Sequence, residues 1–196
     1  NDSGAFPPDS MGAVGPTQFV LAINGRIRVF DKSSSTLGPL DTDTDNFFNT
    51  VRGGASTSDP RVRYDRLSGR WFIIMINVPA SFANNSILIA VSEGATITQT
   101  STWRFVAIQQ QLPAPSGDSG CFADYPTLGI DAQALYIGAN MFCADEFSGT
   151  TAFVVRKSTL LSNSNVVVTA FRNLTGTPNG NGPYTPQGVD NTDPNA

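Results

Sequence analysis

The stretch DPRVRYDRLSGRW, residues 59–71, begins with charged residues at every second position: Asp59, Arg61, Arg63 and Asp65. On an extended strand, side chains at every second position share a face, so the four charged groups would point the same way. Paired carboxylates are what glycoside hydrolysis needs, and a guanidinium can bind the carboxylate or hydroxyls of a ligand. The candidates are therefore, for catalysis, Asp59 and Asp65, and, for ligand binding, Arg61 and Arg63.

A second copy of this stretch, DYPTLGIDAQAL at residues 124–135, keeps the aspartates but not the arginines. Asp124 and Asp131 align with the two aspartates of the first copy, and Tyr125 then reads as an inserted residue that forms a β-bulge. Features that recur indicate architecture, in which the aspartates bond turn amides and cap hairpins. All four aspartates stay candidates for an acid/base pair, but only the arginines differ between the copies.

The chain contains no histidine. This excludes Ser-His-Asp and Cys-His catalysis within it and removes the commonest ligand of catalytic zinc. Asp41, Asp43 and Asp45 have the 1-3-5 spacing of an EF-hand calcium loop, but Asn46 replaces its glycine and Arg52 its bidentate glutamate. A solvated acidic loop is the favoured interpretation, and calcium at these aspartates is the one cofactor that the sequence suggests.

The two cysteines are predicted to form a disulfide. If Asp131 and Ala134 close a hairpin, paired residue numbers sum to 265, and those of Cys121 and Cys143 sum to 264, so one bulge brings them opposite each other. A bridge that closes a loop of this length contributes roughly 3 kcal/mol, and it implies an oxidising compartment. Two free buried thiols are the alternative.

The formal net charge of −4 and the pI of about 4.6 argue against nucleic acid or an anionic membrane as the partner. The longest apolar run, at residues 71–76, has the length of a strand and not of a membrane span. The first ten residues do not resemble a signal peptide, and we expect one to have been removed, because three N-x-[ST] triplets suggest an extracellular, glycosylated protein. These triplets begin at Asn1, Asn84 and Asn173.

Alternating apolar residues separated by Gly, Asn and Pro predict an all-β chain with very little helix. The predicted strands are 17–23, 26–32, 61–65, 71–78, 86–93, 103–109, 126–131, 134–142, 150–157 and 166–172. Asn24-Gly25 between the first two predicts a type I′ hairpin. Two four-stranded units about 65 residues apart form an internal repeat, which is typical of a β-propeller.

The predicted organisation is one domain of blade-like units: a partial unit at 11–50, full units at 57–112 and 121–175, and residues 176–196 as the entry to a further unit or a tail. Propellers close with about 4 to 8 blades, so a partial propeller is expected. Further blades from a longer chain or from another copy would complete it. A β-sandwich built from the same strands is the alternative.

Four segments carry a resemblance to a known family: MGAVGPTQFVLAINGRIRVFDK, DPRVRYDRLSGRWFI, DYPTLGIDAQALYIGANMF and PQGVDNTDPNA. They resemble secreted, propeller-like bacterial proteins of unassigned function, whose chains run on past the last segment. The resemblance implies a propeller-like fold and an extracellular location, and it implies no activity.

The sequence thus predicts a secreted, non-catalytic binding or surface-interaction module, with a glycan or a protein as the partner. A carbohydrate-active hydrolase using paired carboxylates is the first alternative, and a subunit of an assembly that pairs exposed sheet edges is the second. Aromatic residues in loops could stack on sugar rings. The aromatic candidates are Phe47, Phe48, Phe82, Trp103, Phe122 and Tyr184.

Overall fold

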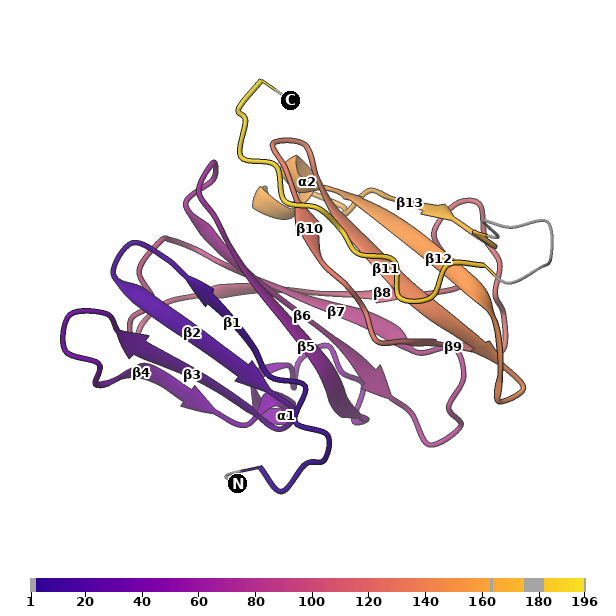
Figure 1. Ribbon diagram of the computed structural model, residues 1–196, viewed down its shortest axis with the longest axis horizontal. Helices are drawn as coiled ribbons and strands as arrows, with labels where there is room; N and C mark the ends of the chain where they lie inside the picture. Colours follow the sequence, from indigo (N-terminus) through magenta and orange to yellow (C-terminus); the bar gives the residue numbers. More distant parts are fainter. Residues whose placement is uncertain (1–2, 163, 175–181, 196) are drawn as a thin grey trace.

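The computed structural model describes residues 3–162, 164–174 and 182–195, which form three antiparallel sheets in sequence order (Figure 1). The first sheet consists of β1 (Met11–Val14), β2 (Gln18–Ile23), β3 (Arg26–Asp31) and β4 (Leu37–Thr42). The middle sheet consists of β5 (Ser56–Asp65), β6 (Arg70–Val78), β7 (Ser86–Ser92) and β8 (Trp103–Gln109). The third sheet consists of β10 (Gly129–Ile130), β11 (Ala134–Cys143), β12 (Glu146–Arg156) and β13 (Val168–Phe171), with β9 (Cys121–Asp124) also paired to β11.

The helices of the described chain are short: α1 (Thr44–Phe47) follows the first sheet, and α2 (Lys157–Leu161) follows β12. The all-β prediction with little helix is confirmed. The three sheets do not close into a ring within the described residues. No helix in the described part of the chain is long and apolar enough to cross a membrane.

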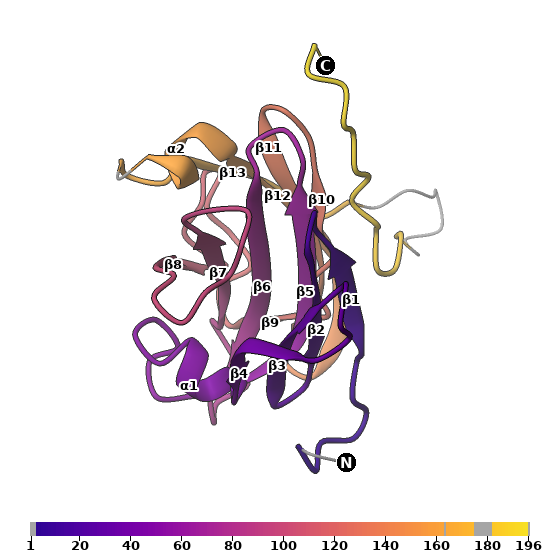
Figure 2. The ribbon, with the colours of Figure 1, turned by 90° about the vertical axis from the view of Figure 1, so that its left-hand side faces the viewer.

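The middle sheet is buried on both faces, which explains its uninterrupted apolar strands (Figure 2). Alternate residues of β6 belong to two separate cores. One core, with the first sheet, contains Trp71, Ile73 and Met75; the other, with the third sheet, contains Phe72, Ile74 and Ile76. A strand with one solvated face would alternate with polar residues, so the run WFIIMI is the sequence signal of this central position.

Residues 11–50 contain a complete four-stranded sheet, which the sequence had predicted only in part. β1 and β4 were not predicted, because neither shows the alternation of β-branched and polar residues that is typical of a strand. β4 contains Gly38 and Pro39, and it lies at the sheet edge, where a proline costs no ladder hydrogen bond.

The predicted hairpin at Asn24-Gly25 is present, with Ile23 paired to Arg26, but its turn is not type I′. Only Gly25 has a positive φ, at 86°, and the signs are those of a type II turn. Asn24 is held by contacts outside the hairpin: its backbone N–H donates to the Pro8 carbonyl, and its Oδ1 accepts from the Asp59 N–H. These contacts fix the residue in a conformation that the dipeptide alone would not choose.

Each sheet has one residue with a positive φ at a similar place, before β1, within β5 and between β9 and β10, and this conformation occurs a fourth time near the C-terminus. The residues are Asp9 (φ 45°), Asp59 (φ 59°), Tyr125 (φ 50°) and Thr185 (φ 50°), and the last three are each followed by proline. The pairing register of the middle sheet shifts by one residue between Ser58 and Arg61. We call these four the junction residues.

This geometry corrects the alignment of the two copies. Tyr125 corresponds in conformation to Asp59 and not to an inserted residue, so Asp124 corresponds to Ser58. The predicted bulge at Tyr125 is therefore a feature of both copies. The alignment was wrong because a gap lets Asp59 of Asp-Pro match Asp124 of Asp-Tyr-Pro. In the structure, the residue with the positive φ is in both copies the one directly before the proline.

Hydrogen bonds from one unit to the next hold the junction residues. The Asp59 N–H donates to Asn24 Oδ1 of the first sheet at 2.8 Å, the Tyr125 N–H to Asp59 Oδ2 at 3.3 Å, and the Thr185 N–H to Asn140 Oδ1 of the third sheet at 2.7 Å. In each case, a side chain of the preceding unit accepts the bond. The repeat is thus also a repeat of contacts between units.

The C-terminal segment, residues 182–195, runs beside β10, as both views show (Figures 1 and 2). The Asn191 N–H donates to the Ile130 carbonyl at 2.9 Å. A Cβ at Gly129 would lie 2.4 Å from the Gly188 carbonyl carbon, so the close approach of the two backbones requires glycine at this position.

Candidate functional site

An open pocket of about 630 Å3 lies at the end of the sheets that holds the first three junction residues. Its walls combine carboxylates with aromatic rings. The carboxylates belong to Asp9, Asp43, Asp45, Asp59 and Asp124, and the rings to Phe6, Phe82, Phe122 and Tyr125. No lysine or arginine lines the pocket among the described residues. The pocket is therefore acidic and partly apolar.

The carboxyl groups of Asp59 and Asp124 are neighbours in the wall of this pocket. Asp59 is only 7 % exposed. Burial, followed by the neighbouring charges of Asp124 and Asp9, raises the pKa of Asp59 to about 6, although a hydrogen bond from Ser58 lowers it. Burial also raises the pKa of Asp124, which is hydrogen-bonded to Asp59. Two carboxyl groups in such contact hold one proton between them, because both cannot ionise cheaply.

This contact differs from the geometry of glycoside hydrolysis. Retaining enzymes hold their two carboxyl groups about 5 Å apart and inverting enzymes up to about 9.5 Å, which leaves room for the sugar or for a water molecule. The carboxyl groups of Asp59 and Asp124 instead interact with each other, and this interaction contributes to the pKa of each. The pair is in a pocket, as a catalytic pair would be, but it is arranged as a proton-sharing pair.

Asp59→Asn should make the stability of the protein less dependent on pH. A carboxyl group whose pKa is raised on folding stabilises the fold most below its unfolded pKa of 3.8, and this stability is lost as pH rises through about 6. We expect the native protein to lose on the order of 1–3 kcal/mol between pH 4 and pH 7, and the variant to lose much less. Urea unfolding at half-unit pH intervals measures this.

Asp145→Asn is the matched control, because Asp145 is exposed and also has a positive φ, at 66°. Its pH profile should follow that of the native protein. If the free energy of unfolding changed with pH equally in the native protein and in Asp59→Asn, the prediction that folding raises the pKa of Asp59 would be wrong.

Asp65 and Asp131 cap hairpin turns, as the sequence predicted. Asp65 accepts from the backbone N–H groups of Leu67 and Ser68, and Asp131 from those of Gln133 and Ala134. Burial alone would raise the pKa of Asp131, but the hydroxyl of Tyr136 and the two backbone donors outweigh it, so the pKa is lowered. Both carboxylates are fully used by the fold and lie outside the acidic pocket.

Lys157 joins these two turns. Its Nζ donates to Asp65 Oδ2 at 2.9 Å and also to the backbone carbonyl of Asp131. Both Asp65 and Lys157 have side chains that are 4 % exposed. The bond therefore links the middle sheet to the third sheet through equivalent positions of the two copies.

Neither arginine of the opening stretch points into the acidic pocket. Arg61 is buried, donates to the Pro60 carbonyl and lies 4.3 Å from the centre of the Tyr125 ring, in cation–π contact. Arg63 forms an ion pair with Asp190 of the C-terminal segment at 2.9 Å. Both contacts join one unit to another, which accounts for the arginines without a ligand.

Comparison with protein-family models, with curated proteins and with solved structures finds no match. The function of the chain therefore has to be argued from its own geometry.

The three aspartates with calcium-loop spacing are separated by their contacts. Asp41 pairs with Arg26 at 2.6 Å and Arg28 at 2.9 Å, and these two hydrogen bonds lower the pKa of Asp41 to about 2. Asp43 caps α1, and Asp45 accepts from Thr57. Among the described residues, no three His, Cys, Asp or Glu side chains are placed so that they could hold one metal ion together. Calcium at these positions stays a prediction.

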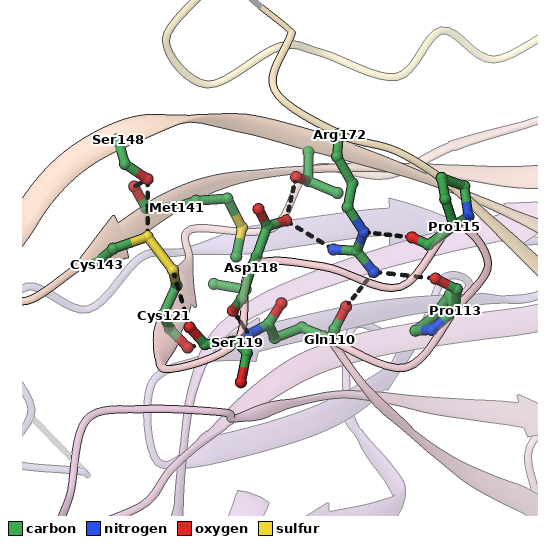
Figure 3. A network of polar contacts seen from close by, with 12 residues as sticks. Gln110, Pro113, Pro115, Asp118, Ser119, Cys121, Met141, Cys143, Ser148 and Arg172 are labelled. Atoms are coloured by element: carbon green, nitrogen blue, oxygen red, sulfur yellow. Dashed lines mark hydrogen bonds and ion pairs between the residues drawn. A yellow bond between two sulfur atoms is a disulfide. The ribbon is translucent and has the colours of Figure 1, made fainter.

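The predicted disulfide is present: Cys121 and Cys143 are bonded and directly paired across β9 and β11 (Figure 3). The register agrees with the sequence argument, since paired residue numbers sum to 264 between β9 and β11 and to 265 between β10 and β11.

The loop before β9 is held by Arg172, which donates to Asp118 at 2.6 Å and to the carbonyls of Gln110, Pro113 and Pro115.

Two of the three predicted glycosylation sites lie in the described chain. Asn84 and Asn173 are exposed with φ 51°, and Asn84 Oδ1 accepts from the Gly120 N–H at 2.7 Å. Asn1 lies outside the described residues. An N-glycan is attached through Nδ2, so the Oδ1 of Asn84 can accept from the Gly120 N–H with or without a glycan.

Sequence reasoning missed several residues of the site. Asp9 had no motif around it, Asn24 was predicted only as a turn residue and not as a partner of Asp9 and Asp59, and Lys157 is a single lysine between a strand and a serine. Among the aromatic candidates, Phe47, Phe48 and Trp103 belong to the core between the first and middle sheets, whereas Phe82, Phe122 and Tyr184 are at least partly exposed. The predicted strands placed only Trp103 of the six candidates in a strand, so the preference for loop aromatics kept Phe82, Phe122 and Tyr184 but also the core residues Phe47 and Phe48.

Proposed function

We propose that this chain is a secreted, non-catalytic binding module and that the acidic pocket binds a carbohydrate. The observation that carries the proposal is the composition of the pocket walls: carboxylate oxygens accept hydrogen bonds from hydroxyl groups, and aromatic faces stack on apolar ring surfaces. Phe6 and Phe82 are 95 % and 59 % exposed, so their rings are available to a ligand. The disulfide supports an extracellular location.

A non-catalytic role is supported by the state of the carboxylates. Asp59 is buried and its carboxyl group interacts with that of Asp124, while Asp65 and Asp131 accept hydrogen bonds from turn amides. The carboxyl groups of a glycoside hydrolase are instead kept apart by the sugar or by a water molecule. The hydrolase remains the rival proposal, and release of reducing ends from any bound oligosaccharide would favour it.

The experiment is binding of neutral and charged oligosaccharides, measured by calorimetry, to the native protein, Phe82→Ala and Phe171→Ala. Loss of the stacking ring should weaken binding by roughly tenfold, since an aromatic contact is worth about 0.5–1.5 kcal/mol beyond its buried area. Phe171 is a matched control, because it is 51 % exposed and lies on β13, away from the pocket. Equal affinities for Phe82→Ala and the native protein would place the binding elsewhere.

We also propose that the three sheets are units of a propeller-like repeat, in keeping with the resemblance noted above. The four junction residues and the contacts from each unit to the next support this, because a ring of blades repeats its neighbour contacts. Thr185-Pro186 supports the C-terminal segment as the inner strand of a further unit. Further sheets after that segment in the full-length protein would support the proposal, and a full-length monomer that ends there would refute it.

One observation favours the assembly alternative. A row of apolar residues crosses the first sheet on the face away from the middle sheet, as the register places Val14 beside Phe19, Phe19 beside Phe30, and Phe30 beside Leu37. Val14 and Leu37 are 56 % and 52 % exposed. A second copy that covers this row would raise the sedimentation mass, and a single-chain mass at high concentration would rule it out.

A further inference from the structure

A second cavity continues the acidic pocket. It measures about 240 Å3 and is lined by Phe82, Phe122, Asp124, Phe142 and Asp145. The first three of these also line the acidic pocket. The two cavities are therefore neighbours that share a wall, and a ligand that fills the first can reach the second without leaving the surface.

Aromatic rings continue the same line beyond the second cavity. The ring centres of Phe82 and Phe122 are 6.0 Å apart, those of Phe142 and Phe147 are 5.9 Å apart, and those of Phe147 and Tyr184 are 5.1 Å apart. Phe122 and Phe142 are direct partners across β9 and β11. Two groups of contacting rings thus meet at the strand pairing of Phe122 with Phe142, which line the same cavity, and we call these five rings the aromatic row.

The aromatic row is both exposed and rigid. Phe82, Phe147 and Tyr184 are 59 %, 38 % and 63 % exposed, which is unusual for large apolar side chains that lie next to one another. The disulfide joins the positions next to Phe122 and Phe142, so the centre of the row is fixed by a covalent bond. A rigid row of rings suits a long ligand, because little entropy is lost when the ligand binds.

The charge of the two cavities selects the ligand further. Their described walls contain six aspartates and no lysine or arginine: Asp9, Asp43, Asp45, Asp59, Asp124 and Asp145. Even with one proton shared between Asp59 and Asp124, the walls repel an anionic polymer and attract a cationic one. Aromatic faces add attraction for ammonium groups.

We infer that the acidic pocket and the aromatic row together form one extended site for a linear polysaccharide whose sugars carry free amino groups. This inference rests on the proposed carbohydrate-binding function and specifies its ligand class. Sugar rings would stack along the row, and their ammonium groups would lie toward the carboxylates of the two cavities. A basic peptide has the same charge, but it lacks the repeated flat rings that match a row of aromatic side chains.

The test is calorimetry with glucosamine oligomers of two to six units, N-acetylglucosamine oligomers of the same lengths, oligogalacturonate and octalysine. We expect the affinity for glucosamine oligomers to rise by at least ~10-fold from dimer to hexamer and to fall with added salt. N-acetylated oligomers should bind several-fold more weakly than glucosamine oligomers, and oligogalacturonate should not bind.

The double variant Phe147→Ala/Tyr184→Ala should reduce the affinity for the hexamer more than that for the dimer. Phe171→Ala should change neither. Asp145→Asn should reduce the preference for glucosamine over N-acetylglucosamine, because it removes a carboxylate without removing a ring.

The outcomes separate this inference from the proposed function. Equal affinity for dimer and hexamer, or for amino and acetylated oligomers, would overturn the inference while sugar binding at the pocket still stands. Tighter binding of octalysine than of the glucosamine hexamer would overturn it in favour of a basic peptide. If no oligosaccharide bound, both proposals would fail.

Discussion

Lys157→Met should destabilise the protein by about 3–5 kcal/mol, because the change leaves the buried carboxylate of Asp65 without its charged partner. Met has a similar length and fills most of the same space, so the loss reports the charge and not a cavity. Urea unfolding at neutral pH gives the free energy of unfolding directly. The variant should also unfold more readily at the contact between the middle and third sheets.

A double variant, Asp65→Asn with Lys157→Met, keeps this prediction falsifiable. It removes both charges, and the single Oδ1 of Asn can still accept from one of the two turn amides that donate to Asp65, so it should recover part of the lost stability. As a control, Asp41→Asn breaks the ion pairs of Asp41 with Arg26 and Arg28, whose side chains are more exposed, and it should destabilise the protein less than Lys157→Met does. A loss for Lys157→Met no larger than this control would mean that the pair is not buried in solution.

Replacing both cysteines by serine should lower the free energy of unfolding by about 3 kcal/mol, since the bridge between Cys121 and Cys143 closes a segment with a sequence separation of 22. A thiol assay should find no free thiol in the native or the unfolded oxidised protein. Reduction should reproduce the effect of the double substitution. A change of less than 1 kcal/mol would show that the backbone pairing of β9 with β11 holds this region unaided.

The disulfide variant also bears on the extended site. Phe122 and Phe142 flank the bridge, so its loss should weaken binding of a glucosamine hexamer even where the protein is still folded. The dimer, which can occupy the acidic pocket alone, should be affected less. Binding measured at 4 °C, well below the unfolding transition, separates this effect from loss of stability.

Much of the fold could be predicted from local patterns. The strands of the middle sheet are long and apolar, and the turn aspartates Asp65 and Asp131 lie in short motifs, so each signal is contained in a few residues. The disulfide was predicted because a hairpin fixes the register, and the register fixes which residues are opposite each other. Edge strands such as β1 and β4 were missed because pairing, and not residue type, makes them strands.

The candidate site was less predictable for a physical reason. Its carboxylates come from three units of the chain. The sequence around a single aspartate such as Asp9 does not indicate that Asp59 and Asp124 lie near it in the fold. Arg61 and Arg63 suggested a binding role because the second copy lacks them. In the structure, Arg61 contacts the ring of Tyr125 and Arg63 pairs with the carboxylate of Asp190, both of which belong to another unit. Residues that differ between copies can thus serve contacts between units as well as a ligand.

The double burial of the middle sheet has a consequence for biosynthesis. β6 exposes a run of six apolar residues, from Trp71 to Ile76, until both neighbouring sheets are in place, and such a run is a hazard for aggregation. The first sheet is translated before β6 and can cover one face at once, while the third sheet emerges later from the ribosome. The chain order therefore limits how long this strand is exposed, and the face toward the third sheet is the one at risk during translation.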